Sequence, residues 1–294
     1  MKTLIIDGNN LIHRTFYTAK AQSKKTTTHT DSQVSNFHIY FTLNAVSSYV
    51  KQFVPDSTIF VWDEKKDHTP NIRKTILKEY KGNRSKDQSP HKNNKVIKSI
   101  LYSMGINSIF PNQLEADDIV AYICSEHEGK KVIVSVDQDF LQLVSSECTL
   151  YDPIRKKFFE KGNFKEQTGY QNVDEWYTAK CLIGDPSDNV PGVPGFGKKT
   201  VQKYLKDPGY ILTEKEHKIF QRNVDIFCLD KYKELPEEKE YYKEQLSVKV
   251  DSCYKTFLNY CKEHSFKRIL DKKEDWHNLF FMKNLYNKLN DIAS

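Results

Sequence analysis

Short runs of β-branched and aliphatic residues alternate with longer amphipathic stretches through the first half of the chain. Three of these runs are apolar on both faces, namely "TLIID" ending at Asp7, "STIFVWD" ending at Asp63 and "KKVIVSVD" ending at Asp137. Such runs are typical of strands buried in a parallel sheet, and the stretches between them are long enough for crossovers. The pattern predicts an α/β fold with a mainly parallel, twisted sheet flanked by helices.

Helical periodicity is clearest in two places, "VSNFHIYFTLNAVSSYVKQF" at residues 34–53 and "LEADDIVAYICSEH" at residues 114–127. Residues 206–294 alternate charged and aromatic positions, which favours amphipathic helices. Packing onto the core is the expected role of that region, with a partner surface at "LFF" (residues 279–281) as the alternative.

Acidic residues gather where these elements begin and end. Parallel sheets bind ligands beyond the carboxyl ends of their strands, so the aspartates that end the three runs are expected at one edge. The helix start in "LEADD" adds Glu115, Asp117 and Asp118, and in an extended chain Asp139 would point the same way as Asp137, two residues before it. A role as a cap or turn residue would explain any one of these acids, but it does not explain the whole set.

Clustered carboxylates need countercharge. Two unit charges about 4 Å apart repel by about 4 kcal/mol at an effective dielectric constant of about 20. Neither Lys nor His is interleaved in "EADD" or "DQD". Hard divalent cations with oxygen ligands supply the missing charge, and Mg²⁺ or Mn²⁺ suits an all-carboxylate site. Because one Mg²⁺ usually takes one or two carboxylates, the sequence predicts more than one ion.

A glycine-rich segment follows at residues 179–205, "AKCLIGDPSDNVPGVPGFGKKTVQKYL". It nearly matches a phosphate-binding P-loop, but Lys199 stands where Ser or Thr would bind magnesium. The favoured interpretation is a helix, a glycine-punctuated turn and a second helix starting near Lys198, a hairpin that binds a nucleic-acid backbone without contacting bases. Its predicted contact residues are Gly192, Gly195, Gly197, Lys198 and Lys199. Asp185 and Asp188 precede them and bring the carboxylates to nine.

The net charge of the chain favours a polyanionic binding partner. The 45 Lys and Arg against 39 Asp and Glu give +6, and setting aside the nine carboxylates leaves 45 − 30 = +15. The six cysteines form no CxxC pair, and the nine histidines form no HxH or HExxH cluster. A reduced cytoplasmic protein without a zinc knuckle, signal peptide or membrane span is therefore expected.

Seven blocks together resemble the phage and bacterial 5′-nuclease (flap endonuclease) family, which includes phage 5′-exonucleases, phage RNase H and the 5′-nuclease domain of bacterial DNA polymerase I. The blocks, in order, are "IIDGNN", "VWD", "EYKGNR", "LEADD", "SVDQDF", "LIGDPSDN" and "VPGVPGFGKKT". The match runs from about residue 3 to 205. The resemblance implies a PIN-like core, a helical arch and a helix-three-turn-helix DNA-binding hairpin.

The same resemblance implies two metal sites that hold Mg²⁺, for which Mn²⁺ can substitute, and it allows a K⁺ ion at the glycine hairpin. Its first site would use Asp7, Asp63, Glu115, Asp117 and Asp118. Its second site would use Asp137, Asp139, Asp185 and Asp188, with some ligands acting through water.

Residues 64–98 hold eleven Lys or Arg against four Asp or Glu, and a solvated helix or loop is the plain alternative to a binding role. Within "EYKGNR", the resemblance implies that Lys81 and Arg84 contact the scissile phosphate at the base of an arch through which single-stranded 5′ ends pass. Arg73 would assist them, and Tyr80 would stack on a base.

Arg14, in "NNLIHR", matches another basic position of the family, with a phosphate contact favoured over a core ion pair. The polar stretch "RSKDQSPHKNNK", residues 84–95, has little apolar periodicity, so the distal arch is expected to be mobile.

The predicted organisation is a catalytic core at residues 1–178, with a basic arch at about 64–104, and a helical region at 179–294. The expected function is that of a monomeric, structure-selective 5′-nuclease of a bacterial or phage-infected cell. It would act by two metal ions on DNA with 5′ flaps or 5′ single-stranded ends, with RNA–DNA hybrids as further substrates, and leave 5′-phosphates. A PIN-type ribonuclease, which lacks the glycine hairpin, and a non-catalytic junction-binding module are the alternatives.

Overall fold

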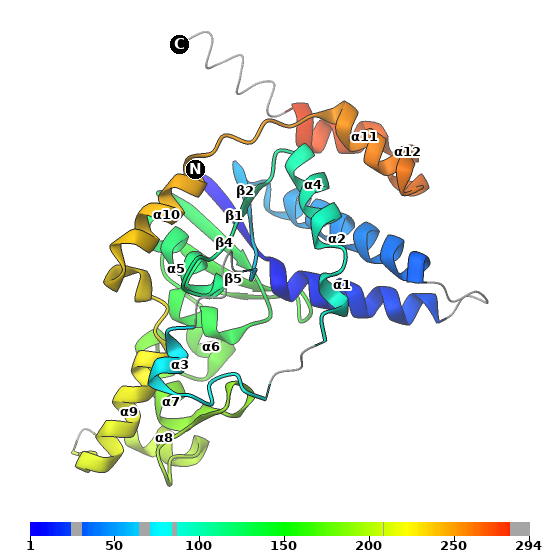
Figure 1. Ribbon diagram of the computed structural model, residues 1–294. Coiled ribbons are helices and arrows are strands. Elements are labelled where there is room, and N and C mark those ends of the chain that lie inside the picture. Colours follow the sequence, from blue (N-terminus) through cyan, green and yellow to red (C-terminus); the bar gives the residue numbers. More distant parts are fainter. Residues whose placement is uncertain (25–30, 65–70, 84–86, 208, 283–294) are drawn as a thin grey trace.

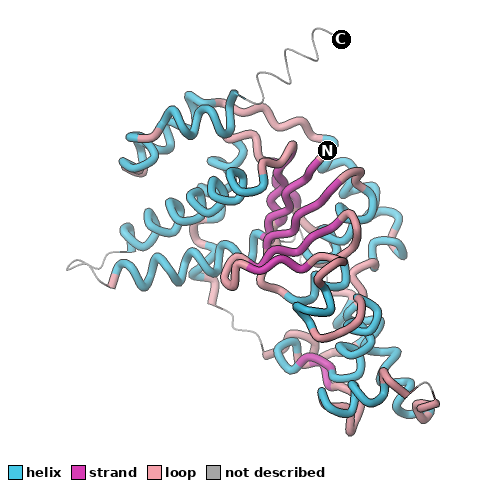
Figure 2. Tube along the Cα trace, turned by 180° about the vertical axis from the view of Figure 1, so that it is seen from behind, coloured by secondary structure: helices cyan, strands magenta, loops and turns pink. Residues whose placement is uncertain are grey.

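The computed structural model describes residues 1–24, 31–64, 71–83, 87–207 and 209–282 of the 294-residue chain. A six-stranded sheet lies at its centre, in the order β3-β2-β1-β4-β5-β6 (Figures 1 and 2). All neighbouring strands are parallel except β5 and β6, which are antiparallel. The strands are β1 (Lys2–Asp7), β2 (Ser57–Val61), β3 (Asn107–Ile109), β4 (Lys130–Val134), β5 (Cys148–Asp152) and β6 (Lys157–Phe159). The predicted fold class is confirmed.

Helices cover both faces of the sheet (Figure 1). Successive residues of β1 point to opposite faces, so Leu4 and Ile6 belong to one hydrophobic cluster and Ile5 to the other. The first face is covered by α1 (Gly8–Ser23), α2 (Asp31–Phe53) and α4 (Asn94–Ser103). The second is covered by α5 (Ala116–Glu126), α6 (Phe164–Thr168) and α10 (Pro236–Ser247).

Two strands end earlier than the sequence predicts. β1 reaches Asp7 as expected, but β2 ends at Val61 and β4 at Val134. After β4 the chain turns at Ser135, whose hydroxyl accepts the backbone N–H of Asp137 at 3.0 Å. Asp63 and Asp137 therefore lie just beyond the ends of their strands, whereas Asp7 is the last residue of β1.

The helices predicted at 34–53 and 114–127 correspond to α2 and α5. The glycine-rich segment lies between α7 (Val173–Ile183) and α8 (Lys198–Tyr204), and its neck is closed by β7 (Gly184–Asp185) pairing with β8 (Val190–Pro191). Next comes α9 (Glu214–Phe227). Figure 1 shows α7, α8 and α9 together at one end of the molecule, below the sheet.

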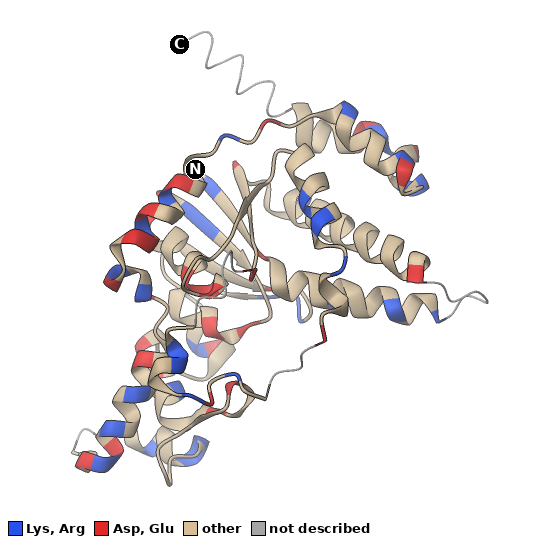
Figure 3. Cartoon of the chain, viewed as in Figure 1, with Lys and Arg blue, Asp and Glu red and all other residues tan. Residues whose placement is uncertain are grey.

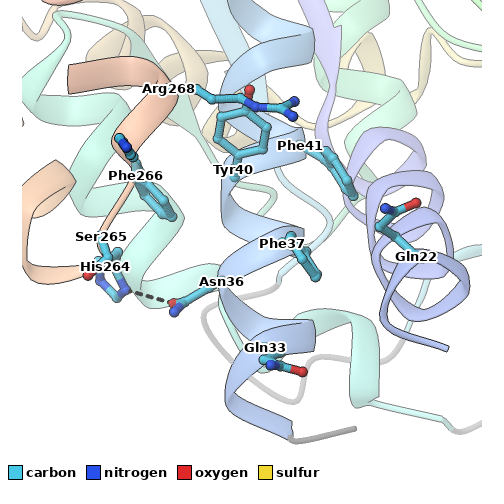
Figure 4. Close-up of a pocket in the computed structure, with 11 residues that line it drawn as sticks. Gln22, Gln33, Asn36, Phe37, Tyr40, Phe41, His264, Ser265, Phe266 and Arg268 are labelled. Carbon is cyan, nitrogen blue, oxygen red and sulfur yellow. Dashed lines mark hydrogen bonds between the residues drawn. The ribbon is translucent and has the colours of Figure 1, made fainter. Parts of the chain in front are cut away.

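The C-terminal helices fold back onto α2 and α4. They are α11 (Tyr254–Glu263), α12 (Lys267–Asp271) and α13 (Lys273–His277). Phe257, Trp276 and Phe281 are buried in the same cluster as Leu43 and Val46 of α2, so the expected packing role is confirmed for this part. Residues 283–294 lie outside the described residues. A pocket remains between α2 and residues 264–268, where the His264 ring lies 3.3 Å from the Asn36 amide oxygen (Figure 4).

The basic segment 64–98 contains α3 (Arg73–Ile76), a 3-10 turn (Ser89–His91) and the start of α4. The His91 ring contacts His13 of α1, with 3.1 Å between the two Nε2 atoms. Arg84 lies outside the described residues, so its predicted role stays a prediction, as does the mobility of the distal arch. Over the described ranges of the chain, no helix has the length and hydropathy of a membrane span.

A buried histidine should make folding sensitive to acid. His38 is fully buried, its Nε2 bonds the Ile12 carbonyl oxygen at 3.1 Å, and the Asn93 amide nitrogen lies 3.1 Å from its Nδ1. Burial, with His91 and His13 nearby, lowers its pKa to about 4 from the ordinary 6.5. Since the unfolded chain takes up this proton first, its stabilising contribution is present above pH 6.5 and is lost as the pH falls towards 4.

We expect the free energy of unfolding at pH 4.5 to be about 2–3 kcal/mol smaller than at pH 7 through this residue alone. The His38→Gln variant keeps a hydrogen-bond donor and an acceptor but does not titrate. Its free energy of unfolding should therefore fall by about 2–3 kcal/mol less than that of the wild type between pH 7 and pH 4.5. Urea unfolding of both proteins at the two pH values measures the difference, and equal losses would contradict the assignment.

Candidate active site

Asp7 is the central acid of the sheet edge. It ends β1 and caps α1, accepting the Asn10 N–H at 3.0 Å, and the Ser135 hydroxyl donates to it at 2.5 Å. Only 8% of Asp7 is exposed. Burial, with repulsion from Asp137 and Asp63, raises its pKa to about 6. The carboxyl ends of β1, β2 and β4 therefore bring their aspartates within electrostatic range, as the sequence predicts.

Glu115 and Asp118 form a capping box at the start of α5. The Glu115 side chain accepts the N–H of Asp118, and the Asp118 side chain accepts the N–H of Glu115 at 3.0 Å. Acidic residues here are favoured by the helix dipole and by unpaired N–H groups. The cap interpretation thus holds for both residues, in addition to any other role.

Asp118 is paired with Arg73. The guanidinium donates to both carboxylate oxygens, at 2.8 and 2.7 Å, and both side chains are buried. Two of the predictions therefore need correction. Arg73 cannot reach a DNA phosphate from the interior, and Asp118 is engaged by a fixed cation, so it is removed from the proposed metal ligands.

Glu115 gathers four donors from the basic segment. It accepts Asn71 at 2.8 Å, Lys81 at 2.7 Å and the Tyr80 hydroxyl at 3.0 Å, and Arg73 lies 3.2 Å away. Burial alone would raise its pKa, but Lys81 and Arg73 outweigh it and lower the pKa to about 2.

Tyr80 is only 4% exposed. Its predicted stacking on a base is therefore wrong for this arrangement, because its ring packs inside the protein.

A second lysine bridges the outer acids. The Lys180 ammonium of α7 donates to Asp139 and lies 3.1 Å from Asp185. Burial, with repulsion from Asp137, raises the pKa of Asp139 to about 6 even though Lys180 opposes the shift. Burial also acts on Asp185, but Ser187 and Lys180 outweigh it and lower its pKa. The ammonium thus lies where the sequence predicts the second metal site.

Three acids keep uncompensated charge. Asp7, Asp117 and Asp137 make no direct ion pair with Lys or Arg within the described ranges of the chain. Burial raises the pKa of Asp117 well above its ordinary value, Lys81 opposes the shift, and Asp137, Glu115 and Asp7 add to it. These acids therefore crowd together between β1, α5 and the turn after β4, where bound cations would favour their ionised forms.

This charge fits divalent cations, though not as a preformed cage. Among the described residues, no three His, Cys, Asp or Glu side chains converge closely enough to hold one ion directly. The donors are all carboxylate oxygens, the type that Mg²⁺ and Mn²⁺ prefer, and Mg²⁺ commonly keeps several waters. Burial, with repulsion among the neighbouring acids, raises the pKa values of Asp7, Asp117 and Asp139, and divalent cations bound among them would offset that repulsion.

The remaining predicted acids lie at the rim. Asp63 is exposed just beyond β2, whereas Asp188 is 6% exposed and lies 4.0 Å from the Lys81 ammonium. Arg14, half-buried on α1, donates to the Tyr49 hydroxyl at 2.5 Å. Its phosphate contact stays a prediction.

The glycine hairpin is built for close backbone contact at its neck and is open at its tip. A Cβ on Gly192 would lie 2.1 Å from the Ile183 carbonyl oxygen, so closing the neck already requires glycine there. Gly195 has φ +83°, and a Cβ on Gly195 or Gly197 would meet no atom within 4 Å. Lys198 and Lys199 are exposed at the start of α8, on the lysine-bearing end of the molecule in Figure 3.

Lys180, Ser135 and Asn71 are polar residues of the site that the sequence analysis did not single out. Lys180 lies in the last turn of α7, five positions before Asp185, and Ser135 directly follows β4. A lysine one helical turn before an acidic loop is a usable signal, but only the fold shows that it reaches Asp139 from a separate segment.

The sheet order, the acidic edge and the glycine hairpin define a resolvase-like α/β domain of the nuclease type. The chain belongs to the 5′-3′ exonuclease family, since the model of that family's N-terminal resolvase-like domain matches residues 2–169.

A 5′-3′ exonuclease of Aquifex aeolicus is 33% identical over 218 residues, covering 72% of this chain and 71% of that protein. A DNA polymerase I of Caldicellulosiruptor bescii is 30% identical over 223 residues, and there the chain spans only 24% of the relative's length. The T5 5′-exonuclease with bound zinc has a TM-score of 0.65 at 20% identity, covering 84% of this chain and 99% of that one.

Removing one acid should have opposite effects with and without metal. Asp137→Asn should stabilise the metal-free protein by about 1–2 kcal/mol, because it relieves repulsion on Asp7, Asp117 and Asp139. Saturating Mg²⁺ or Ca²⁺ should raise the Tm of the wild type. At a cation concentration of about 100 times Kd, the free energy of unfolding should increase by about 2.7 kcal/mol, and the increase should be smaller in the variant.

Thermal unfolding with EDTA and with each cation makes the comparison. Asp174→Asn, at an exposed position of α7, is the matched control and should behave like the wild type. A wild-type Tm that does not respond to divalent cations would contradict the site.

Proposed function

We propose that this protein is a structure-selective 5′-nuclease that hydrolyses phosphodiester bonds of DNA near 5′ single-stranded to double-stranded junctions. The observation that carries the proposal is the concentrated negative charge of Asp7, Asp117 and Asp137 beside Lys81, in a chain of the 5′-3′ exonuclease family. Flap and exonuclease substrates, with removal of RNA primers, follow from the family. A monomer acting alone is part of the proposal.

One group of Mg²⁺ ligands would consist of Asp7, Asp63, Glu115 and Asp117. The other would consist of Asp137, Asp139, Asp185 and Asp188. Mn²⁺ would substitute, since both ions prefer oxygen ligands. Bound divalent cations supply Lewis acidity, a hydroxide nucleophile and stabilisation of the leaving 3′-oxygen, which suits in-line hydrolysis to 5′-phosphates. A K⁺ ion at the glycine hairpin belongs to the proposal as well.

Lys81 is the group best placed to orient the scissile phosphate. Its ammonium is held by Glu115 at 2.7 Å and lies 4.0 Å from Asp188, and its backbone N–H bonds the Asp188 carbonyl oxygen at 2.9 Å. It therefore stands between the two groups of acids with a fixed main chain and a side chain that can exchange partners. Arg84 and Arg14 complete the proposed phosphate contacts.

Lys180 has a complementary role in this proposal. Its ammonium bridges Asp139 and Asp185, so it supplies countercharge to the second group when cations are absent. Lys180 would have to loosen its contacts for both carboxylates to bind an ion.

The glycine hairpin would hold duplex DNA by its backbone. Lys198 and Lys199 are exposed next to Gly195 and Gly197, around which there is room for a phosphate. The hairpin disfavours a PIN-type ribonuclease, and the uncompensated acids disfavour a module that only binds junctions.

Cleavage of a 5′-flap substrate, labelled at the flap end, tests the function. With Mg²⁺ we expect the labelled flap to be released by a cut near the junction and to end in a 3′-hydroxyl, with the 5′-phosphate on the remaining strand, and with EDTA no product. Asp139→Asn should lower the rate by at least about 100-fold while binding in Ca²⁺ changes little, because the variant loses a charged ligand but no DNA contact. Products ending in 3′-phosphates, or full activity of the variant, would contradict the two-metal assignment.

Replacing Lys198 and Lys199 by alanine should weaken DNA binding equally for all sequences. Removing two phosphate contacts should reduce the slope of log K against log salt by about 2. Fluorescence anisotropy in Ca²⁺ at several salt concentrations measures this slope. A change in base preference would contradict backbone recognition.

A further inference from the structure

The guanidinium of Arg73 joins three segments that are far apart in sequence. Its Nη atoms donate to both oxygens of Asp118, at 2.8 and 2.7 Å, and Nη1 lies 3.2 Å from Glu115. Its Nε bonds the Ile226 carbonyl oxygen at 2.7 Å, and Nη2 bonds the Cys228 carbonyl oxygen at 2.9 Å. Four of the five N–H donors of the fork make hydrogen bonds and Nη1 also lies beside Glu115, so the orientation of Arg73 is closely constrained.

Those two carbonyls belong to the C-terminal end of α9 and the residue that caps it. The last carbonyls of a helix have no partner within the helix, and a buried cation at the negative end of the dipole satisfies them. Arg73 therefore fixes the end of α9 to the start of α5, where Glu115 lies.

Side chains of the same helix hold the neck of the glycine hairpin. The Asn223 amide is buried and donates to the carbonyl oxygens of Cys181 at 2.7 Å and Pro191 at 3.1 Å. Arg222 donates to the Pro191 carbonyl oxygen at 2.6 Å. One helix thus contacts the hairpin through Pro191 and the acidic site through Arg73.

A small core stiffens this connection. Tyr80 of the basic segment, Cys181 of α7, Val190 of the hairpin neck, and Ile226 and Phe227 of α9 are buried against one another. A shift of α9 would move Tyr80, whose hydroxyl bonds Glu115, and with it the adjacent Lys81.

We propose that Arg73, with Asn223 and Arg222 of α9, positions Lys81 and Glu115 according to whether duplex DNA occupies the glycine hairpin. The inference rests on the proposed nuclease function and adds a reason for its selectivity. Duplex bound at Lys198 and Lys199 holds the neck, α9 transmits that constraint, and the Arg73 fork places Glu115 and Lys81. These three act as positioning residues in the proposal, because they reach the site through Glu115 and through main-chain carbonyl oxygens of α9 and the hairpin neck.

The test compares single-turnover cleavage, at saturating enzyme with Mg²⁺, of a 5′-flap on a duplex and of a single strand of the same sequence. In the wild type, the duplex should raise the rate. Arg73→Lys keeps the charge but loses the fork, and it should reduce this duplex advantage by about three- to thirtyfold while changing the single-strand rate less than about twofold. Arg222→Ala should reduce it in the same direction.

Lys218→Ala is the matched control, because Lys218 lies on α9 and pairs only with the exposed Glu214 in the described contacts. It should keep the wild-type advantage. A variant that combines Arg73→Lys with Lys198→Ala and Lys199→Ala should lose no more of the duplex advantage than the more affected of its two parent variants. The reason is that both sets of changes act on the same connection.

Equal losses on both substrates in Arg73→Lys would show a merely structural role and overturn the proposal. Should Arg73→Lys fail to fold, Arg222→Ala decides, and a wild-type duplex advantage in that folded variant overturns the proposal. A wild-type enzyme that cleaves neither substrate refutes the nuclease function itself, which is a separate result.

Discussion

Negative charge held at the edge of a parallel sheet is the constraint on which the rest of this structure depends. The strands β1 and β4 deliver Asp7 and Asp137 to one place, and α5 adds Asp117. Burial raises the pKa of Asp7 to about 6, with repulsion from the neighbouring acids adding to the shift. Buried acids at such an edge take up protons unless cations, from the protein or from solution, balance their charge.

The protein provides part of that countercharge through cationic side chains that differ in how tightly they are held. Arg73 makes five contacts, two of them with the carboxylate of Asp118. Lys81 and Lys180 carry ammonium groups on flexible stems, and Lys81 pairs with Glu115 whereas Lys180 bridges Asp139 and Asp185. A guanidinium fork suits a fixed junction, whereas an ammonium group can exchange partners when metal or phosphate arrives. This difference matches the roles proposed for these residues, in which Arg73 fixes the structure and Lys81 and Lys180 respond to phosphate and metal.

Uncharged hydrogen bonds also join the acidic edge to the hairpin end of the molecule. The turn at Lys81 bonds the loop at Asp188 through its backbone, and the Asn189 side chain bonds the Glu79 carbonyl oxygen at 3.0 Å. Together with α9, these contacts make the basic segment and the glycine hairpin parts of one surface. Recognition of a junction between single and double strands requires such a surface, because one element must hold each part of the substrate.

The sequence by itself determined the sheet, the acidic edge and the hairpin. Runs that are apolar on both faces specify buried parallel strands, and an aspartate after such a run must lie at the carboxyl edge. Only the tertiary structure decided the partner of each charge. Arg73 and Asp118 are 45 residues apart, and Lys180 and Asp139 are 41 apart. A local pattern carries no record of such pairings. The burial of Tyr80 and Arg73, and the ion pair that Asp118 makes with Arg73, are therefore decided by the tertiary structure alone.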